Sequence, residues 1–152
     1  MTALSPLLSS GLILSARCAP CIHAAFQDAH DNLLLAISAR DARGEFFALD
    51  CAAVRPALVE VIHFRPQVVR GNYRHQRCTE MLTVLSGALD MYLLCTCPGK
   101  HLFCKRMERG ACVHLPPGTA HAAHTLTETE IVSVFADDDP RLDRERVDLI
   151  RL

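Results

Sequence analysis

The sequence predicts an all-β fold, an antiparallel sandwich or barrel. Short apolar runs alternate with turn residues about every eight to twelve positions, and no stretch between them has helical spacing. Residues 27–37 could be drawn as a helix, but their apolar side chains gather at one end, so a strand is favoured. The 152 residues, half of them apolar, suffice for one domain with a buried core.

The expected elements follow in chain order. Residues 1–20 are expected to form an arm with a short strand at 11–15, followed by a barrel over 21–136 and a tail over 137–152. The tail is expected outside the core, as a short surface helix or packed on a partner subunit. The expected barrel strands are 21–26, 33–38, 45–49, 59–64, 81–85, 88–95, 101–107, 111–115, 120–125 and 131–135.

Turn residues separate these runs. Polar connectors are expected at 27–32 and 39–44, and glycine or proline marks the later turns. Those turns lie at 86–87, 98–100, 108–110 and 116–118.

Composition excludes several classes of partner. A net charge of -1 provides no large positive field, so nucleic acid is not an expected partner. The apolar run within residues 4–14 is interrupted by serine and proline, too short to span a membrane and unlike a signal peptide. Eight cysteines in an apolar chain of this size are read as reduced thiols, which predicts a cytoplasmic protein. The Cys18–Cys21 pair is expected in a loop.

Two clusters carry the residue types of a functional site. The first, over 69–87, contains His75 and Glu80, and the second, over 110–121, adds His121. Two imidazoles and a carboxylate inside an apolar barrel would form a metal site or an acid/base site.

Seven positions in these clusters resemble the two motifs of the cupin superfamily. The motifs are Gly-x5-His-x-His-x3-4-Glu-x6-Gly and Gly-x5-Pro-x-Gly-x2-His-x3-Asn. The resemblance implies a double-stranded β-helix, the RmlC-like jelly-roll barrel, with its site inside. The matching positions are His75, Glu80, Gly87, Gly110, Pro116, Gly118 and His121.

Two positions depart from the motifs. Tyr73 stands at the family's first histidine, and Thr125 stands at its closing asparagine. The family's set of three histidines and one glutamate therefore reduces to His75, Glu80 and His121, with the Tyr73 phenol completing or lining the site. The resemblance implies a divalent metal (Zn, Fe, Mn or Ni) bound by these three residues, or weaker binding, or none. A degenerate cupin whose site residues only hydrogen-bond one another is the alternative.

Because side chains alternate along a strand, the candidate site residues divide between its two faces. Tyr73 and His75 are two positions apart and share a face in a regular strand, whereas Arg74 points to the other side. His124 falls on the face opposite His121 and is excluded from the site. His114 is expected at the rim.

The segment Arg70–His75 resembles the Arg-Gly-x-His-x-His segment of nucleotide-sugar epimerases and 3,4-ketoisomerases in capsule and lipopolysaccharide synthesis. This resemblance implies an isomerase acting on a keto-sugar nucleotide in polysaccharide biosynthesis, in a homodimer. His75 would serve as base and Tyr73 as acid, or a metal would stabilise the oxyanion while Tyr73 transfers the proton. The guanidinium groups expected to steer a diphosphate belong to Arg70, Arg74 and Arg77.

Two other functions remain open at this point. One is an Fe(II)-dependent oxygenase that uses the same three ligands. The other is a non-catalytic cupin that binds a small molecule or carbohydrate.

Overall fold

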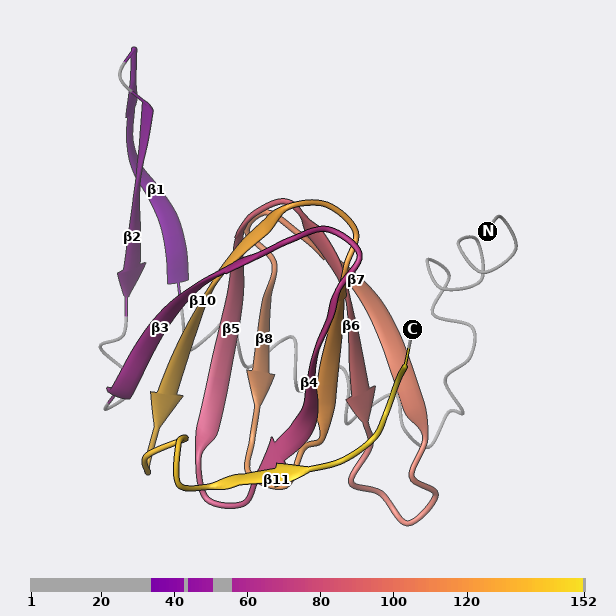
Figure 1. The fold of residues 1–152 in the computed structure, drawn as a ribbon. Helices are drawn as coiled ribbons and strands as arrows, with labels where there is room; N and C mark the ends of the chain where they lie inside the picture. Colours follow the sequence, from indigo (N-terminus) through magenta and orange to yellow (C-terminus); the bar gives the residue numbers. More distant parts are fainter. Residues whose placement is uncertain (1–33, 43, 51–55, 152) are drawn as a thin grey trace.

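The computed structural model describes residues 34–42, 44–50 and 56–151, and the elements in these ranges are all strands. The all-β prediction is therefore confirmed, and two antiparallel sheets form a jelly-roll sandwich (Figure 1). No helix in the described ranges has the length and apolar character needed to cross a membrane. The expected strands at 11–15 and 21–26, the arm and the Cys18–Cys21 pair lie outside the described residues.

The strands alternate between the two sheets along most of the chain. A separate hairpin pairs β1 (Leu34–Asp41) with β2 (Gly44–Asp50). The four-stranded sheet has the order β3 (Pro56–Phe64), β10 (Thr129–Ala136), β5 (Thr79–Ser86) and β8 (Cys112–Leu115). The five-stranded sheet has the order β11 (Arg144–Arg146), β4 (Val69–His75), β9 (His121–Thr125), β6 (Ala88–Leu94) and β7 (Leu102–Glu108).

The core lies between the sheets and follows from strand alternation. Alternate residues of β3 point toward the core, and the last of them, Phe64, is buried. Val59 and Val61 lie between these positions and face outward. Burying each large apolar side chain contributes about 1.5–3 kcal/mol. The central cluster includes Phe64, Leu82, Val84, Leu89, Met91, Leu93, Met107, Val113 and Ile131.

Two glycines of the sequence motifs are explained by close contacts. Gly87 has a φ of 79°, and a Cβ there would collide with the carbonyl oxygen of Glu128. Gly71, with a φ of 89°, lets β4 approach β9, because a Cβ would lie 2.9 Å from the carbonyl oxygen of His121. The backbone of β4 is irregular beside this glycine, and Tyr73 pairs directly with His121.

The tail joins the sheet, so the expectation of a short surface helix is wrong. β11 pairs antiparallel with β4, with Arg144 opposite His75 and Arg146 opposite Tyr73. Asn72 anchors the residues that follow: its side-chain oxygen accepts hydrogen bonds from the backbone N–H groups of Leu149 and Ile150, at 3.0 and 3.1 Å. In Figure 1, β11 runs across the lower end of the barrel, and the chain beyond it rises toward the C-terminus.

Candidate functional site

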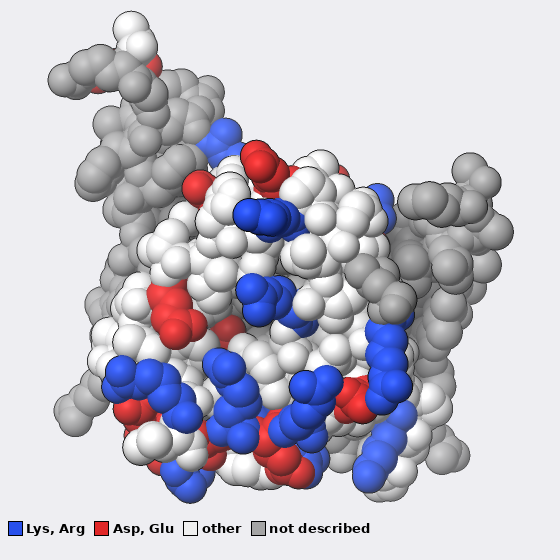
Figure 2. Space-filling view, in the orientation of Figure 1, with Lys and Arg blue, Asp and Glu red and all other residues white. Residues whose placement is uncertain are grey.

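A cavity of about 630 Å³ opens between β3, β4 and β11. Its size falls within the range of small-molecule sites, roughly 300–1,000 Å³. One wall is largely apolar and the other is basic, and Figure 2 shows Lys and Arg side chains gathered over the lower part of the face, with acidic side chains between them. The lining residues are Glu60, Ile62, Phe64, Val69, Arg70, Gly71, Asn72, Tyr73, Arg144 and Arg146.

Tyr73 lies between this cavity and two buried imidazoles. Its ring meets His75 and His121 edge-on, with centroids 5.2 and 4.8 Å apart, and the Arg144 guanidinium lies 4.4 Å from the ring centroid. Burial, and after it the nearby Glu80 carboxylate, raise the pKa of the Tyr73 phenol well above its ordinary value. The phenol therefore stays protonated at neutral pH and can donate a hydrogen bond.

Glu80 and His121 form a buried pair behind Tyr73. Oε2 of Glu80 lies 3.2 Å from Nε2 of His121, and the Ser133 hydroxyl donates a 2.8 Å hydrogen bond to Oε1 of Glu80. Burial alone would raise the pKa of Glu80, but His121, Ser133 and His75 together hold it below its ordinary value. The carboxylate is therefore ionised and supplies negative charge beneath the site.

His75 is buried, and its two ring nitrogens lack regular hydrogen-bond partners. It is 4% exposed, packs edge-on against Phe135, and neither nitrogen makes a hydrogen bond of regular geometry. Burial lowers the pKa of His75, and the Glu80 carboxylate offsets only part of that effect. An unsatisfied buried polar group costs about 1–3 kcal/mol, so this imidazole is a candidate for a chemical role.

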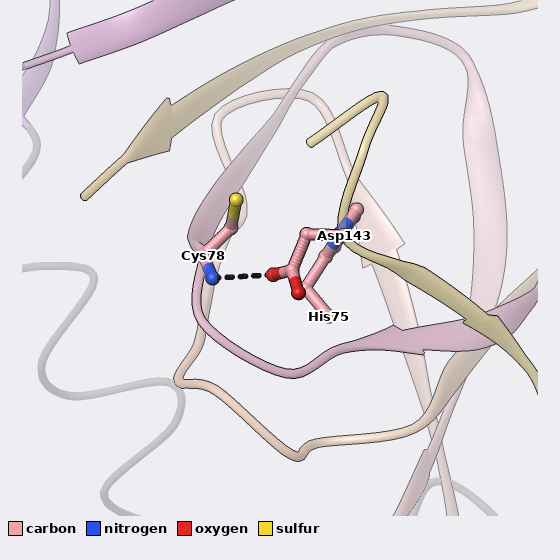
Figure 3. A group of neighbouring side chains, drawn as sticks. All are labelled: His75, Cys78 and Asp143. Carbon is pink, nitrogen blue, oxygen red and sulfur yellow. Dashed lines mark hydrogen bonds between the residues drawn. The ribbon is translucent and has the colours of Figure 1, made fainter. Parts of the chain in front are cut away.

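The predicted metal triad is not preassembled. Although Glu80 and His121 touch, the triad His75, Glu80 and His121 does not bring one ligand atom from each residue within 4.8 Å of the others. In the part of the chain that the structure describes, the one group that does is His75, Cys78 and Asp143 (Figure 3). This buried group could hold a metal ion, whereas the triad as it stands does not fit one.

Cys78 and Asp143 were missed as candidates from the sequence. Cys78 follows His75 by three positions, and that His-x2-Cys spacing was a usable signal. Asp143 carried no such signal, because it reaches the site from a tail expected outside the core. It is 6% exposed.

Only one of the three arginines predicted to bind substrate lies at the cavity. Arg70 lines the cavity, but Arg74 makes two 2.9 Å hydrogen bonds to Glu145, and Arg77 pairs with Asp138. Neither Arg74 nor Arg77 lines the cavity, so their predicted part in substrate binding is not supported. Arg144 and Arg146, which β11 brings to the wall, line the cavity beside Arg70. His114 and His124 do not line it either.

A jelly roll with a buried His–Glu cluster between its two sheets defines a β-barrel of the cupin type. The sequence model of the cupin family matches residues 58–145, more than half of the chain, and the protein belongs to that family. No curated protein sequence matches the chain.

Solved structures with the same fold include sugar-nucleotide enzymes. The QdtA 3,4-ketoisomerase from Thermoanaerobacterium thermosaccharolyticum, in complex with TDP, is 15% identical with a TM-score of 0.59, over 76% of this chain and 87% of that one. A 3,4-ketoisomerase from Helicobacter canadensis is 15% identical, with a TM-score of 0.59 over 76% and 86%. ChmJ, a 3'-monoepimerase from Streptomyces bikiniensis in complex with dTDP-quinovose, is 16% identical with a TM-score of 0.60, over 76% and 66%. At these identities the likeness establishes the fold.

Proposed function

We propose that this cupin is an isomerase, an epimerase or 3,4-ketoisomerase, that acts on a keto-sugar nucleotide in polysaccharide biosynthesis. One observation carries the proposal: Tyr73 lines a cavity with three arginines and contacts two buried imidazoles behind it. Proteins of the same fold that bind TDP and dTDP-sugars support this substrate class.

The cavity wall suits a nucleoside diphosphate bound to a sugar. Arg70, Arg144 and Arg146 offer planar donor groups that match phosphate oxygens in pairs. Across the cavity, Ile62 and Phe64 provide an apolar surface for a base or a deoxysugar. The Glu60 carboxylate on the same strand can accept hydrogen bonds from sugar hydroxyls.

The proposed chemistry begins with removal of a proton from a carbon beside a carbonyl group. His75 takes the proton from the carbon next to the carbonyl, the C–H electrons form the enolate, and Tyr73 donates a hydrogen bond to its oxygen. Delivery of a proton to the opposite face of the same carbon gives an epimer. For the ketoisomer, the enolate oxygen takes up a proton, the neighbouring hydroxyl loses one to form the new carbonyl, and the former carbonyl carbon takes the proton held by His75. His75 is neutral because of its lowered pKa, and Tyr73 remains protonated because of its raised pKa.

A binding protein without turnover is the second candidate. Tyr73 in place of the family's first histidine favours it, because a phenol with a raised pKa is a poor base. The oxygenase alternative depends on iron at His75, Glu80 and His121, which are not assembled for it.

Incubation with dTDP-4-keto-6-deoxyglucose, followed by NMR of the products, tests the proposal. We expect a new sugar isomer with the wild type and with the Arg74→Gln control, whose guanidinium lies away from the cavity. Tyr73→Phe should lose the activity while still binding the nucleotide. Tight nucleotide binding without any isomer in the wild type would favour the binding protein.

The cellular location and the dimer are parts of the same proposal. A cytoplasmic location agrees with the thiol state of Cys78, Cys104 and Cys112. Val59 and Val61, 49% and 71% exposed on β3 at the edge of its sheet, offer an apolar surface for a second copy.

A further inference from the structure

We propose that His75, Cys78 and Asp143 form a thiolate-containing site for a zinc-like divalent cation, distinct from the histidine and glutamate set of the family motif. One ligand atom from each of the three buried residues lies within 4.8 Å of the other two. Figure 3 shows the three residues side by side: His75 at the end of β4, Cys78 in the turn before β5, and Asp143 in the segment before β11. The inference does not rest on the proposed isomerase function. A cation bound to the lone pair of His75 would stop that residue from acting as the base, so the two roles belong to the metal-bound and metal-free protein respectively.

His75 provides the first argument for a ligand here. Both of its ring nitrogens are buried without a regular hydrogen bond, and one of them lies within 4.8 Å of Cys78 and Asp143. A neutral imidazole presents a lone pair, and a cation would satisfy a nitrogen that the protein leaves unsatisfied.

Asp143 is held firmly in position for coordination. Its Oδ2 atom accepts hydrogen bonds from the backbone N–H groups of Arg77 and Cys78, at 2.7 and 2.8 Å. These two bonds fix the carboxylate beside the turn that joins β4 to β5. They also give Asp143 a structural role of its own, so the metal is not needed to explain its burial. Nη1 of Arg77 lies 3.9 Å from Oδ1 and opposes a cation there.

Cys78 supplies the sulfur that defines the site. Its thiol donates a 3.0 Å hydrogen bond to the carbonyl oxygen of Asp138, and burial raises its pKa to about 11. On metal binding the S–H bond breaks, the proton passes to solvent, and the thiolate binds the cation. Nitrogen, sulfur and oxygen donors together favour zinc-like ions over magnesium or calcium.

The spacing requires only a small contraction. Tetrahedral zinc, with bonds of about 2.0–2.3 Å, places its ligands roughly 3.3–3.8 Å apart. Ligand atoms now up to 4.8 Å apart would move inward by about 1 Å, a shift available to a side chain such as Cys78. Three protein ligands leave a fourth position for water.

The site has a consequence for the cavity. Asp143 directly precedes β11, whose Arg144 and Arg146 line the cavity wall. A cation that links Asp143 to His75 and Cys78 would fasten this strand to the barrel. By linkage, metal and nucleotide would then strengthen each other's binding.

Cobalt(II) titration of the reduced protein tests the site directly, because a cobalt–thiolate bond gives an intense near-ultraviolet charge-transfer band. We expect this band in the wild type, its displacement by zinc, and its retention in Cys112→Ser and Glu80→Gln. Cys78→Ser should abolish the band and weaken metal binding by about a hundredfold or more, since even outer-shell changes cost 10–100-fold. A missing band in the wild type, or one that persists in Cys78→Ser, would overturn the proposal.

A second variant covers the case in which Cys78→Ser does not fold. Arg77→Gln keeps the backbone N–H bonded to Asp143 and removes an exposed opposing charge. Cobalt should then bind about two- to fivefold more tightly, the range expected for an exposed charge pair. Unchanged or weaker binding would contradict the site. The measurement needs no sugar, so it can fail while isomerisation succeeds, and the reverse also holds.

Discussion

Tyr73 and His121 pair in register across β4 and β9, with their ring centroids 4.8 Å apart. The contact depends on Gly71, which allows the two strands to come together at this point. Because Tyr73 also lines the cavity, this pair connects the cavity to the buried Glu80 carboxylate, which touches His121.

Nucleotide affinity should depend on Arg144 and not on Arg74. Arg144→Gln removes a guanidinium from the cavity wall, and a charged hydrogen bond contributes about 1.5–3 kcal/mol, so TDP should bind roughly ten- to a hundredfold more weakly. Arg74→Gln breaks only an exposed pair with Glu145 and should change affinity little. Calorimetric titration with TDP measures both. Equal losses in the two variants would place the nucleotide elsewhere.

Asn72 should control how firmly the C-terminal strand is held. Asn72→Gly keeps a residue tolerant of the φ of 59° but removes the side-chain bonds to Leu149 and Ile150. We expect a loss of about 1–3 kcal/mol in stability and faster amide exchange over residues 144–150. Hydrogen exchange followed by mass spectrometry localises the effect. An equal increase in amide exchange across the whole barrel would show that Asn72 stabilises the whole fold instead.

Gly87 and Gly110 form a matched pair for the turns. Both have positive φ, but a Cβ at Gly87 meets backbone atoms of Glu128 and Thr129, whereas one at Gly110 meets nothing within 4 Å. Gly87→Ala should therefore cost about 3 kcal/mol or more, and Gly110→Ala only about 1–2 kcal/mol from backbone strain. Urea denaturation gives both values. Equal costs would mean that the close contact at Gly87 is relieved by a backbone shift.

Stability should fall as the solution is acidified from neutral pH because of His75. The pKa of His75 is lowered by burial, so the unfolded chain binds a proton near pH 6.5 that the folded protein resists. The free energy of unfolding should decrease below about pH 6.5, by up to about 1.4 kcal/mol per pH unit from this group. His75→Gln should reduce that slope when denaturation is followed from pH 7 to 5. An unchanged slope would assign the acid sensitivity to other groups.

The sequence predicted most strands of the two barrel sheets, because alternation and turn residues are local signals, but it placed no strand at β4 and counted the separate β1–β2 hairpin as part of the barrel. The strands expected at 59–64, 88–95 and 131–135 lie within or close to β3, β6 and β10. β11 was missed, since Arg144–Arg146 is short, charged and exposed, and only its pairing with β4 makes it a strand.

The site was predicted only in part, because local sequence patterns do not encode contacts between segments that are far apart in the chain. Motif spacing pointed to Tyr73, His75, Glu80 and His121, but it said nothing about the distances between their tips. The structure places Tyr73 against both imidazoles and Glu80 against His121. Asp143 and Arg144 reach the site through a pairing between segments about seventy positions apart, which no local pattern encodes. Arg74 and Arg77 were chosen by their nearness in sequence, and their acidic partners in the tail hold them away from the cavity.

Proton exchange in deuterated water tests the central claim most directly. Wild-type protein is mixed with dTDP-4-keto-6-deoxyglucose in D₂O, and the sugar protons beside the carbonyl are followed by NMR. The account predicts deuterium at a carbon next to the carbonyl at a rate set by the enzyme concentration, and no enzyme-dependent exchange with Tyr73→Phe. If the wild type binds the compound and leaves those protons in place, this cupin is not an isomerase of that substrate.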